Sequence, residues 1–97
     1  MQTYIILINL TDQGIKNIKE APARVEMMAK SLEAAGGRLV SFYAVMGQYD
    51  YVAIAEGPSD ETAFIQLMTL GMLGNARTVT LKAFKRGEFA DIVKKLP

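Results

Sequence analysis

The chain has 97 residues, of which 51% are hydrophobic, and its mean hydropathy is +0.15. This length predicts one domain spanning residues 1–97, and the apolar content excludes a disordered chain. Eleven basic and ten acidic side chains leave a net charge of +1 without any basic block, so we expect no binding to nucleic acid. The absence of cysteine and histidine removes disulfides, thiol nucleophiles and the commonest metal ligands.

Other absences narrow the functional class further. No apolar run reaches the length of a membrane span, and the first residues lack a basic leader, so we expect a cytoplasmic protein without membrane contact. Residues 71–75 lack the Lys-Ser/Thr ending of a phosphate loop and follow a predicted helix instead of preceding one. The acidic side chains are scattered and form no oxygen cage. We therefore expect no metal and no cofactor.

The first half of the chain predicts a strand followed by a divided helix. Residues 3–10 form a continuous apolar run, typical of a strand that is covered on both faces. From Ile15 to Leu32 apolar residues recur at spacings of three and four, which indicates a helix. Ala21-Pro22 falls inside this stripe and is expected to kink it or divide it into a short helix and a longer one. The pair Gly36-Gly37 ends it.

The second half predicts three strands and two helices. Residues 38–46 and 51–55 read as strands that pair antiparallel across a short turn. Ser59 is a suitable N-cap for a helix that ends near Gly71, and residues 76–84 alternate as a strand does. Residues 88–96 read as a last short helix. The predicted inward-facing side chains of the two helices are Ala63, Phe64, Leu67, Met68 and Gly71, and Phe89, Ile92, Val93 and Leu96.

This order predicts an α+β, ferredoxin-like βαββαβ fold with an extra C-terminal helix. Two right-handed crossovers place both long helices on one face of the sheet. We expect Val79 and Leu81 to point toward the helices. The open face would then carry two groups of side chains: Thr78, Thr80 and Lys82, and Tyr51, Ala53 and Ala55.

An open face that mixes apolar side chains with tyrosine and threonine suits neither solvent nor a closed core. We expect two such sheets to pack together in a homodimer, a dimeric α/β barrel that encloses a partly polar cavity. The alternative is a monomer in which the C-terminal helix folds over the open face. An assembly larger than a dimer is left open.

The motif Gly47-Gln48-Tyr49-Asp50 carries a resemblance that extends over nearly the whole chain. It is accompanied by Thr11-Asp12-Gln13-Gly14-Ile15, Gly36-Gly37-Arg38-Leu39 and the segment 71–78. Together these segments resemble the GYD-domain family, small ferredoxin-like proteins of unassigned function. The resemblance implies a dimeric α/β-barrel type of fold and no particular activity.

A more distant resemblance is to the effector-binding domain of the Lrp/AsnC regulators. That domain also has a Gly-x-Tyr-Asp motif followed by an apolar strand, here residues 51–54, and a Gly- and Thr-rich entry to its last strand, here residues 74–80. The present chain has no DNA-binding helix-turn-helix in front of these motifs. The resemblance therefore implies ligand binding or sensing.

Each candidate site residue also has a purely structural interpretation. Asp50 can hold a turn by accepting backbone N–H bonds, or it can meet a ligand. The tyrosines can cap a core edge or line a cavity. Lys82 can extend its amine into solvent from an edge, or it can bind an anion. The break at Ala21-Pro22 is a simple kink, or it frees a helix start that holds an anion together with Arg24.

The resulting hypothesis is a small-molecule binding or sensing module with its cavity between the sheets of a homodimer. The candidate ligand-binding residues are Tyr43, Tyr49, Asp50, Tyr51, Thr78, Thr80 and Lys82. The positive charge of Lys82 favours a small anionic or carbonyl-bearing metabolite. Two alternatives are kept: a cofactor-independent enzyme of the monooxygenase or isomerase type, and a purely structural assembly protein. No catalytic residue is assigned.

Overall fold

The computed structural model describes residues 1–97 and contains four strands that form a single antiparallel sheet in the order β2-β3-β1-β4. This is the ferredoxin-like α+β arrangement, as the order of the predicted elements indicated. The elements are β1 (Gln2–Leu10), α1 (Asp12–Lys16), the 3₁₀ turn η1 (Ile18–Glu20), α2 (Ala21–Ala34), β2 (Arg38–Ala44), β3 (Tyr51–Gly57), α3 (Asp60–Met72), β4 (Ala76–Ala83) and α4 (Arg86–Val93).

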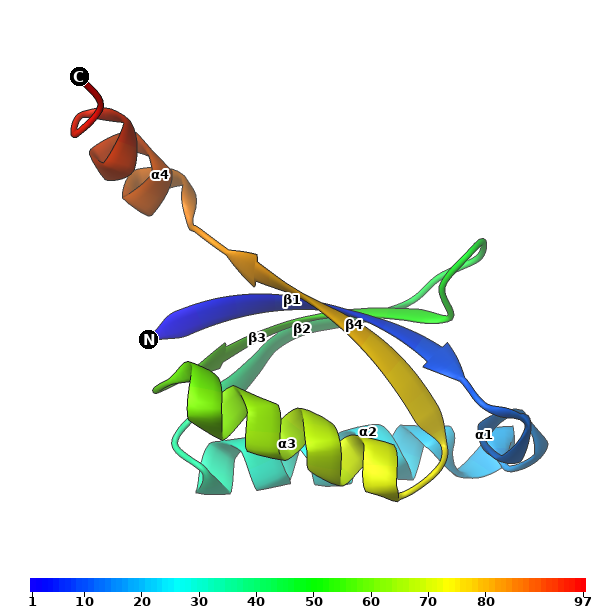
Figure 1. The fold of residues 1–97 in the computed structure, drawn as a ribbon. Helices are drawn as coiled ribbons and strands as arrows, with labels where there is room; N and C mark the ends of the chain where they lie inside the picture. Colours follow the sequence, from blue (N-terminus) through cyan, green and yellow to red (C-terminus); the bar gives the residue numbers. More distant parts are fainter.

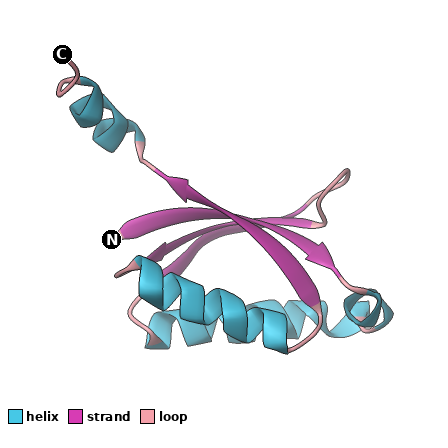
Figure 2. Ribbon diagram, viewed as in Figure 1, coloured by secondary structure: helices cyan, strands magenta, loops and turns pink.

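Helices α2 and α3 lie side by side against one face of the sheet, and no element covers the other face (Figure 1). The expectation that both long helices share one face is therefore confirmed. Helix α4 begins two residues earlier than expected, at Arg86, and it stands away from the sheet at the end of β4 (Figure 2). The C-terminal helix therefore does not fold over the open face, as the monomeric alternative required. No helix is long and apolar enough to span a membrane.

Local sequence signals explain where the helices begin. The Thr11 hydroxyl accepts a hydrogen bond from the Gly14 N–H at 3.1 Å and so caps α1. The Ser59 hydroxyl accepts from the Thr62 N–H at 3.2 Å and caps α3 in the same way. Pro22 occupies the first turn of α2, where its missing N–H breaks no helical bond. The predicted division of the first helical segment at Ala21-Pro22 is confirmed.

The strand register shows which side chains face the helices. Tyr4, Ile6 and Ile8 of β1 are opposite Ala55, Ala53 and Tyr51 of β3, and opposite Lys82, Thr80 and Thr78 of β4. Directly paired residues share a face. Tyr4, Ile6 and Ile8 lie on the same cavity wall as Met28 of α2 and Leu67 of α3, so this shared face is the one that the helices cover.

The predicted orientation of the sheet is therefore wrong. Tyr51, Ala53, Ala55, Thr78, Thr80 and Lys82 face the helices, while Val79 and Leu81 face outward. Alternation along a strand shows which residues share a face, but it leaves open which of the two faces the helices cover. In β4 the outward-facing residues are the more apolar set. The assumption that apolar side chains face the helices therefore predicted the opposite orientation of the sheet.

The chain buries little of its own apolar surface. Tyr4, Ile8 and Ala53 are among only ten buried residues, and Ala53 is fully enclosed. The accessible surface is 6857 Å², whereas a compact monomer of this mass exposes about 5,500 Å². The excess arises from an uncovered sheet face and a projecting helix.

Candidate functional site

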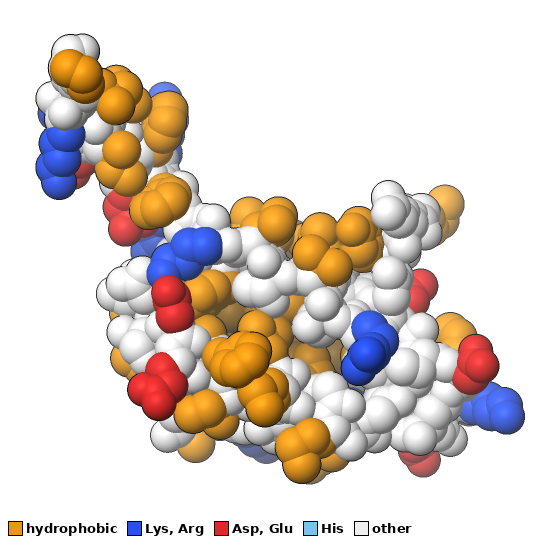
Figure 3. Space-filling view, in the orientation of Figure 1, with side chains coloured by type: hydrophobic (Ala, Val, Ile, Leu, Met, Phe, Trp, Pro, Cys, Tyr) orange, Lys and Arg blue, Asp and Glu red, His pale blue; other side chains and the backbone are white.

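The uncovered side of the sheet forms the first apolar surface, which we call the open face. It includes Val79 and Leu81 of β4, about half exposed, and Tyr43 of β2, 60% exposed. Hydrophobic side chains gather along this upper side of the molecule in the space-filling view (Figure 3). Between them lie half-buried side chains of the two central strands, namely Ile5, Leu7, Val52 and Ile54.

An ionic cluster around the buried Glu56 carboxylate closes one end of the open face. The Glu56 carboxylate accepts a hydrogen bond from Arg38 Nε at 2.7 Å and pairs with Lys85 Nζ at 2.5 Å. Its side chain is only 7% exposed. The bonds from Lys85 first and Arg38 second lower the pKa of Glu56 to about 2. Because Lys85 directly precedes α4, this cluster fixes the base of the projecting helix to the sheet.

Residues 84–97, which we call the C-terminal arm, form a second set of uncovered hydrophobic side chains. Phe84, Phe89 and Leu96 are each at least 60% exposed. The arm lies on the side of the sheet opposite to α2 and α3, beyond the end of β4 (Figure 1). The expectation that Phe89, Ile92, Val93 and Leu96 point inward is wrong for the single chain, because no element of the same chain reaches them.

A third apolar surface runs along the outside of α3. Phe64, Ile65, Met68 and Met72 are 62%, 55%, 52% and 84% exposed, and their spacing places them on one side of the helix. We call this set the outer α3 stripe. Of the predicted inward-facing side chains of α3, Ala63 and Leu67 do face the sheet, whereas the prediction is wrong for Phe64 and Met68. A helix that is apolar on both sides is normally covered on both sides, and this signal was present in the sequence.

Lys82 belongs to a polar cluster between the sheet and the start of α3. The Tyr4 hydroxyl donates to Asp60 Oδ1 at 2.5 Å, and Lys82 Nζ contacts the same oxygen at 2.5 Å. The Lys82 amine also lies 5.4 Å from the centre of the Tyr4 ring. Burial, followed by the bond to Asp60, raises the pKa of Tyr4 to about 12. The bonds from Lys82 and then Tyr4 lower the pKa of Asp60. The amine expected to meet an anionic ligand is therefore paired within the chain.

Asp50 connects the β2–β3 loop to β1. Its Oδ2 accepts a hydrogen bond from the Leu10 N–H at 2.8 Å. Its own N–H donates to the Ile8 carbonyl, and its carbonyl accepts from the Val45 N–H, both at 2.9 Å. Tyr49 is half-buried beside it, and Gly47 adopts a φ of +123°, which favours glycine. These contacts favour the structural interpretation of the motif over a direct role in ligand binding.

The seven predicted site residues do not meet at one place in the chain. Thr80 and Lys82 share a face with Tyr51, but Tyr43 lies on the opposite face, because an irregularity between Leu39 and Ser41 shifts the β2 register. Phe42 takes the expected place, with its ring centroid 4.9 Å from that of Tyr51.

Asp50 and Lys82 lie near opposite ends of β1, beside Leu10 and Tyr4 respectively. These positions are six residues apart along the strand, which is roughly 20 Å. Thr78 is opposite Ile8, between the two ends. Within one chain these groups do not form a common catalytic arrangement.

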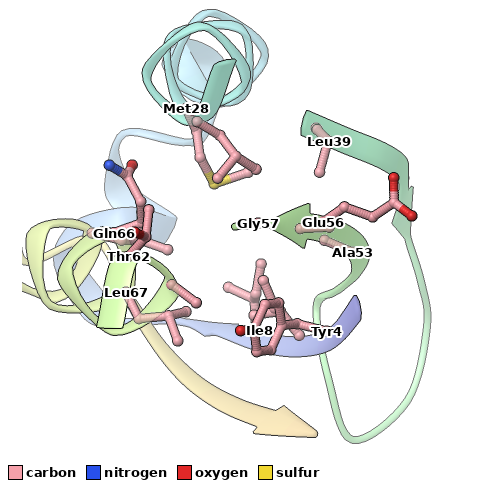
Figure 4. Close-up of a pocket in the computed structure, with 15 residues that line it drawn as sticks. Tyr4, Ile8, Met28, Leu39, Ala53, Glu56, Gly57, Thr62, Gln66 and Leu67 are labelled. Carbon is pink, nitrogen blue, oxygen red and sulfur yellow. The ribbon is translucent and has the colours of Figure 1, made fainter. Parts of the chain in front are cut away.

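A small cavity lies between the helices and the Tyr4 end of the sheet (Figure 4). Met28 and Leu67 point into it from the two helices, and Leu39, Tyr4 and Ile8 point into it from the sheet. Its volume is about 50 Å³, which is room for one or two water molecules. It is a gap in core packing and is too small for a metabolite.

The fold and these surfaces define a class: a ferredoxin-like α+β domain with an uncovered sheet, a projecting helix and no assembled catalytic group. Residues 4–93 match the GYD domain, and the chain belongs to the GYD-domain family.

Two matches from Thermus thermophilus are similar to this chain. One is a protein named glutamine synthetase and cystathionine beta-lyase binding protein; it is 34% identical over 97 residues, and the match covers 99% of each chain. The other is a crystal structure of TTHA0845, which superimposes with a TM-score of 0.51 at 26% identity over 88% of this chain and 95% of that one. The expected family and fold are both confirmed.

Proposed function

We propose that this chain is a protein-binding module that forms a homodimer through the open face and binds a partner enzyme through the outer α3 stripe. The main support for this proposal is that one small chain exposes apolar surfaces both on the open face of its sheet and on the outer side of its helices. Large exposed apolar patches on a small protein mark interaction sites. The similar Thermus protein is named as a binding protein for two enzymes, which agrees with a partner role.

The open face is the surface that suits a second copy of the chain. The C-terminal arm lies on the same side as this face (Figure 1), so a copy placed on the sheet would also contact the arm. A twofold axis between two sheets pairs each apolar strand with the same surface of its partner. The excess exposed area of the free chain would then be covered, including Val79 and Leu81.

The outer α3 stripe lies on the opposite side of the molecule and would stay accessible in such a dimer. Met68 and Met72 supply half of its large side chains. Methionine is flexible and polarisable, and surfaces rich in it adapt to more than one partner. Two different enzymes appear in the name of the Thermus protein. We therefore choose glutamine synthetase and cystathionine beta-lyase as the first partners to test.

The other functions considered from the sequence need side chains in places where the structure does not have them. A polar ligand cavity between two sheets requires Tyr51, Thr78, Thr80 and Lys82 on the open face, and all four face the helices. A cofactor-independent enzyme built on Asp50, Lys82 and the tyrosines requires these groups to meet within the chain. Protein binding needs no such group of adjacent catalytic side chains and uses surfaces that are exposed in the free chain.

The test of the partner site is direct binding of the purified protein to each of the two enzymes of its source organism. We expect at least one enzyme to bind, and Met68→Lys to weaken binding by about tenfold or more, as does truncation of a central interface residue. The matched control is Met46→Lys, because Met46 is 99% exposed in the β2–β3 loop, which lies on the other side of the sheet from α3 (Figure 1). The partner site is disproved if neither enzyme binds or if Met68→Lys binds like the wild type.

The homodimer is tested separately by light scattering. We expect twice the chain mass for the wild type and for Met68→Lys, and the mass of a single chain for Val79→Glu. Val79 is half exposed, so a carboxylate there leaves the single chain folded but is costly inside an apolar interface. A monomeric wild type would contradict the dimer. A monomeric Met68→Lys would show that the outer α3 stripe pairs copies of the chain instead of binding an enzyme.

A further inference from the structure

A second and larger cavity lies between α2, α3 and the helix-facing side of the sheet. Its volume is about 410 Å³, which is in the range of small-molecule sites. Most of its wall is apolar and is supplied by the sheet and both helices, with Ile8 from β1, Met28 from α2 and Leu70 from α3. Neither the open face nor the outer α3 stripe contributes to it, so it is independent of the proposed partner surfaces.

One cationic side chain, Arg24 of α2, lies on the wall of this cavity. It is three-quarters buried, with 25% of its side chain exposed. Its Nη1 donates to the Asn17 carbonyl at 3.0 Å and lies 3.7 Å from Glu20 Oε2. Its Nη2 is out of contact with solvent and has no hydrogen-bond partner. A buried donor left without a partner is unfavourable, and an acceptor in the cavity would relieve it once the guanidinium has rotated to turn Nη2 toward the cavity.

Two hydroxyl groups on the wall already have partners within the chain. The Ser31 hydroxyl donates to Gln66 Oε1 at 3.1 Å and links the two helices. The Thr69 hydroxyl donates to the Ile65 carbonyl at 2.8 Å. Arg24 is the one cationic group on the wall and is therefore the group that selects the charge of a ligand's polar end. Guanidinium binds carboxylate strongly and with defined geometry. Because Glu20 already offsets part of the charge, a singly charged anion suits this position better than a phosphate.

We propose that this cavity binds a monocarboxylate with an apolar tail. The carboxylate takes the free donor of Arg24 after a small rotation of the guanidinium, and the tail extends between the helices and the sheet along Ile8, Met28 and Leu70. The ligand class follows from the combination of one unmet cationic donor and a mostly apolar wall. The proposal does not depend on the homodimer or on any enzyme partner.

The test uses decanoate below its micelle concentration, with decan-1-ol and inorganic phosphate as comparisons, and observes the methionine methyl groups by NMR. We expect decanoate to shift the resonances of Met27 and Met28, which line the cavity, and to leave Met46 in its remote loop unchanged. Decan-1-ol should bind about tenfold more weakly or worse, because it lacks the charge-assisted bond. Phosphate should cause no shift.

The variant Arg24→Gln tests the contribution of the ligand's carboxylate to binding separately from that of its apolar tail. We expect it to weaken decanoate binding by about tenfold and to leave decan-1-ol binding unchanged; the matched control Arg86→Gln, on the distant α4, should bind like the wild type. Equal binding of decanoate by wild type and Arg24→Gln overturns the proposal. So do equal affinities for decanoate and decan-1-ol, no binding at all, or shifts spread over all exposed methionines. If Arg24→Gln does not fold, the wild-type comparison of the three probes decides alone.

Discussion

Removal of the Asp50 carboxylate tests whether the Gly-Gln-Tyr-Asp motif is structural. Asp50→Ala leaves the half-buried Leu10 N–H without the acceptor that now lies at 2.8 Å. Loss of a hydrogen bond to a charged group costs about 1.5–3 kcal/mol, part of it from the unsatisfied donor. For a domain of this size each kcal/mol lowers the melting temperature by about 4–8 °C. We therefore expect the variant to melt roughly 10 °C below the wild type.

The assay is urea unfolding together with thermal melting at a fixed protein concentration, since assembly also contributes to stability. Asp50→Asn keeps one acceptor oxygen and should lose less than half as much. Asp91→Ala is the matched control, because its carboxylate is 75% exposed and lies 3.9 Å from Lys94; it should change stability little. If Asp50→Ala unfolds at the same urea concentration as the wild type, the bond to Leu10 contributes nothing and the structural interpretation fails.

Other contacts lead to three further predictions. Glu56 has a folded-state pKa of about 2, below its ordinary 4.5, so the stability that its carboxylate contributes should be complete above pH 4.5 and disappear as the pH falls toward 2. The urea midpoint of Glu56→Gln should therefore depend on pH less than that of the wild type across this range. Tyr4 has a pKa raised from 10 to about 12, so its stabilisation should be lost above pH 10, and a phenolate absorbance titration should lose its latest step in Tyr4→Phe. Gly14→Ala places a Cβ against the Asn75 carbonyl oxygen and should lower the free energy of unfolding by about 1–3 kcal/mol or more. In contrast, the new Cβ of Gly71→Ala in α3 meets no atom within 4 Å, so this variant should raise the free energy of unfolding by roughly 0.5–1 kcal/mol. Equal melting temperatures for these two variants would contradict the geometry.

The sequence was a good guide to the order of elements because local signals decide it. The caps Thr11 and Ser59, and the break at Pro22, act within one turn of helix and need no knowledge of the rest of the chain. The βαββαβ order then leaves few topologies, because crossovers between parallel strands are right-handed. The fold followed from these steps, and the family resemblance agreed with it.

The candidate site could not be predicted in the same way, because it depends on which face of the sheet is covered. The pattern of β4 separates Thr78, Thr80 and Lys82 from Val79 and Leu81 correctly, but both faces of β1 are apolar, so nothing local assigns the helices to one side. The β2 irregularity before Ser41 also moved Tyr43 to the face opposite Tyr51. A change of register by one residue inverts every side chain of a strand.

The wrong assignment of the covered sheet face and the wrong assignment of Phe64 and Met68 to the core have a common physical origin, and it supports the proposed assembly. Binary patterning identifies the core of a single chain when only one face of each element is apolar. Here β1 and α3 are apolar on two faces, and the second face of each is exposed in the free chain. A sequence selected only to fold as a monomer gains no stability from Phe64, Met68, Val79 or Leu81 at these exposed positions, and it risks aggregation. These exposed apolar positions, which the sequence pattern assigned to the core of a single chain, are therefore the positions at which we expect other chains to bind.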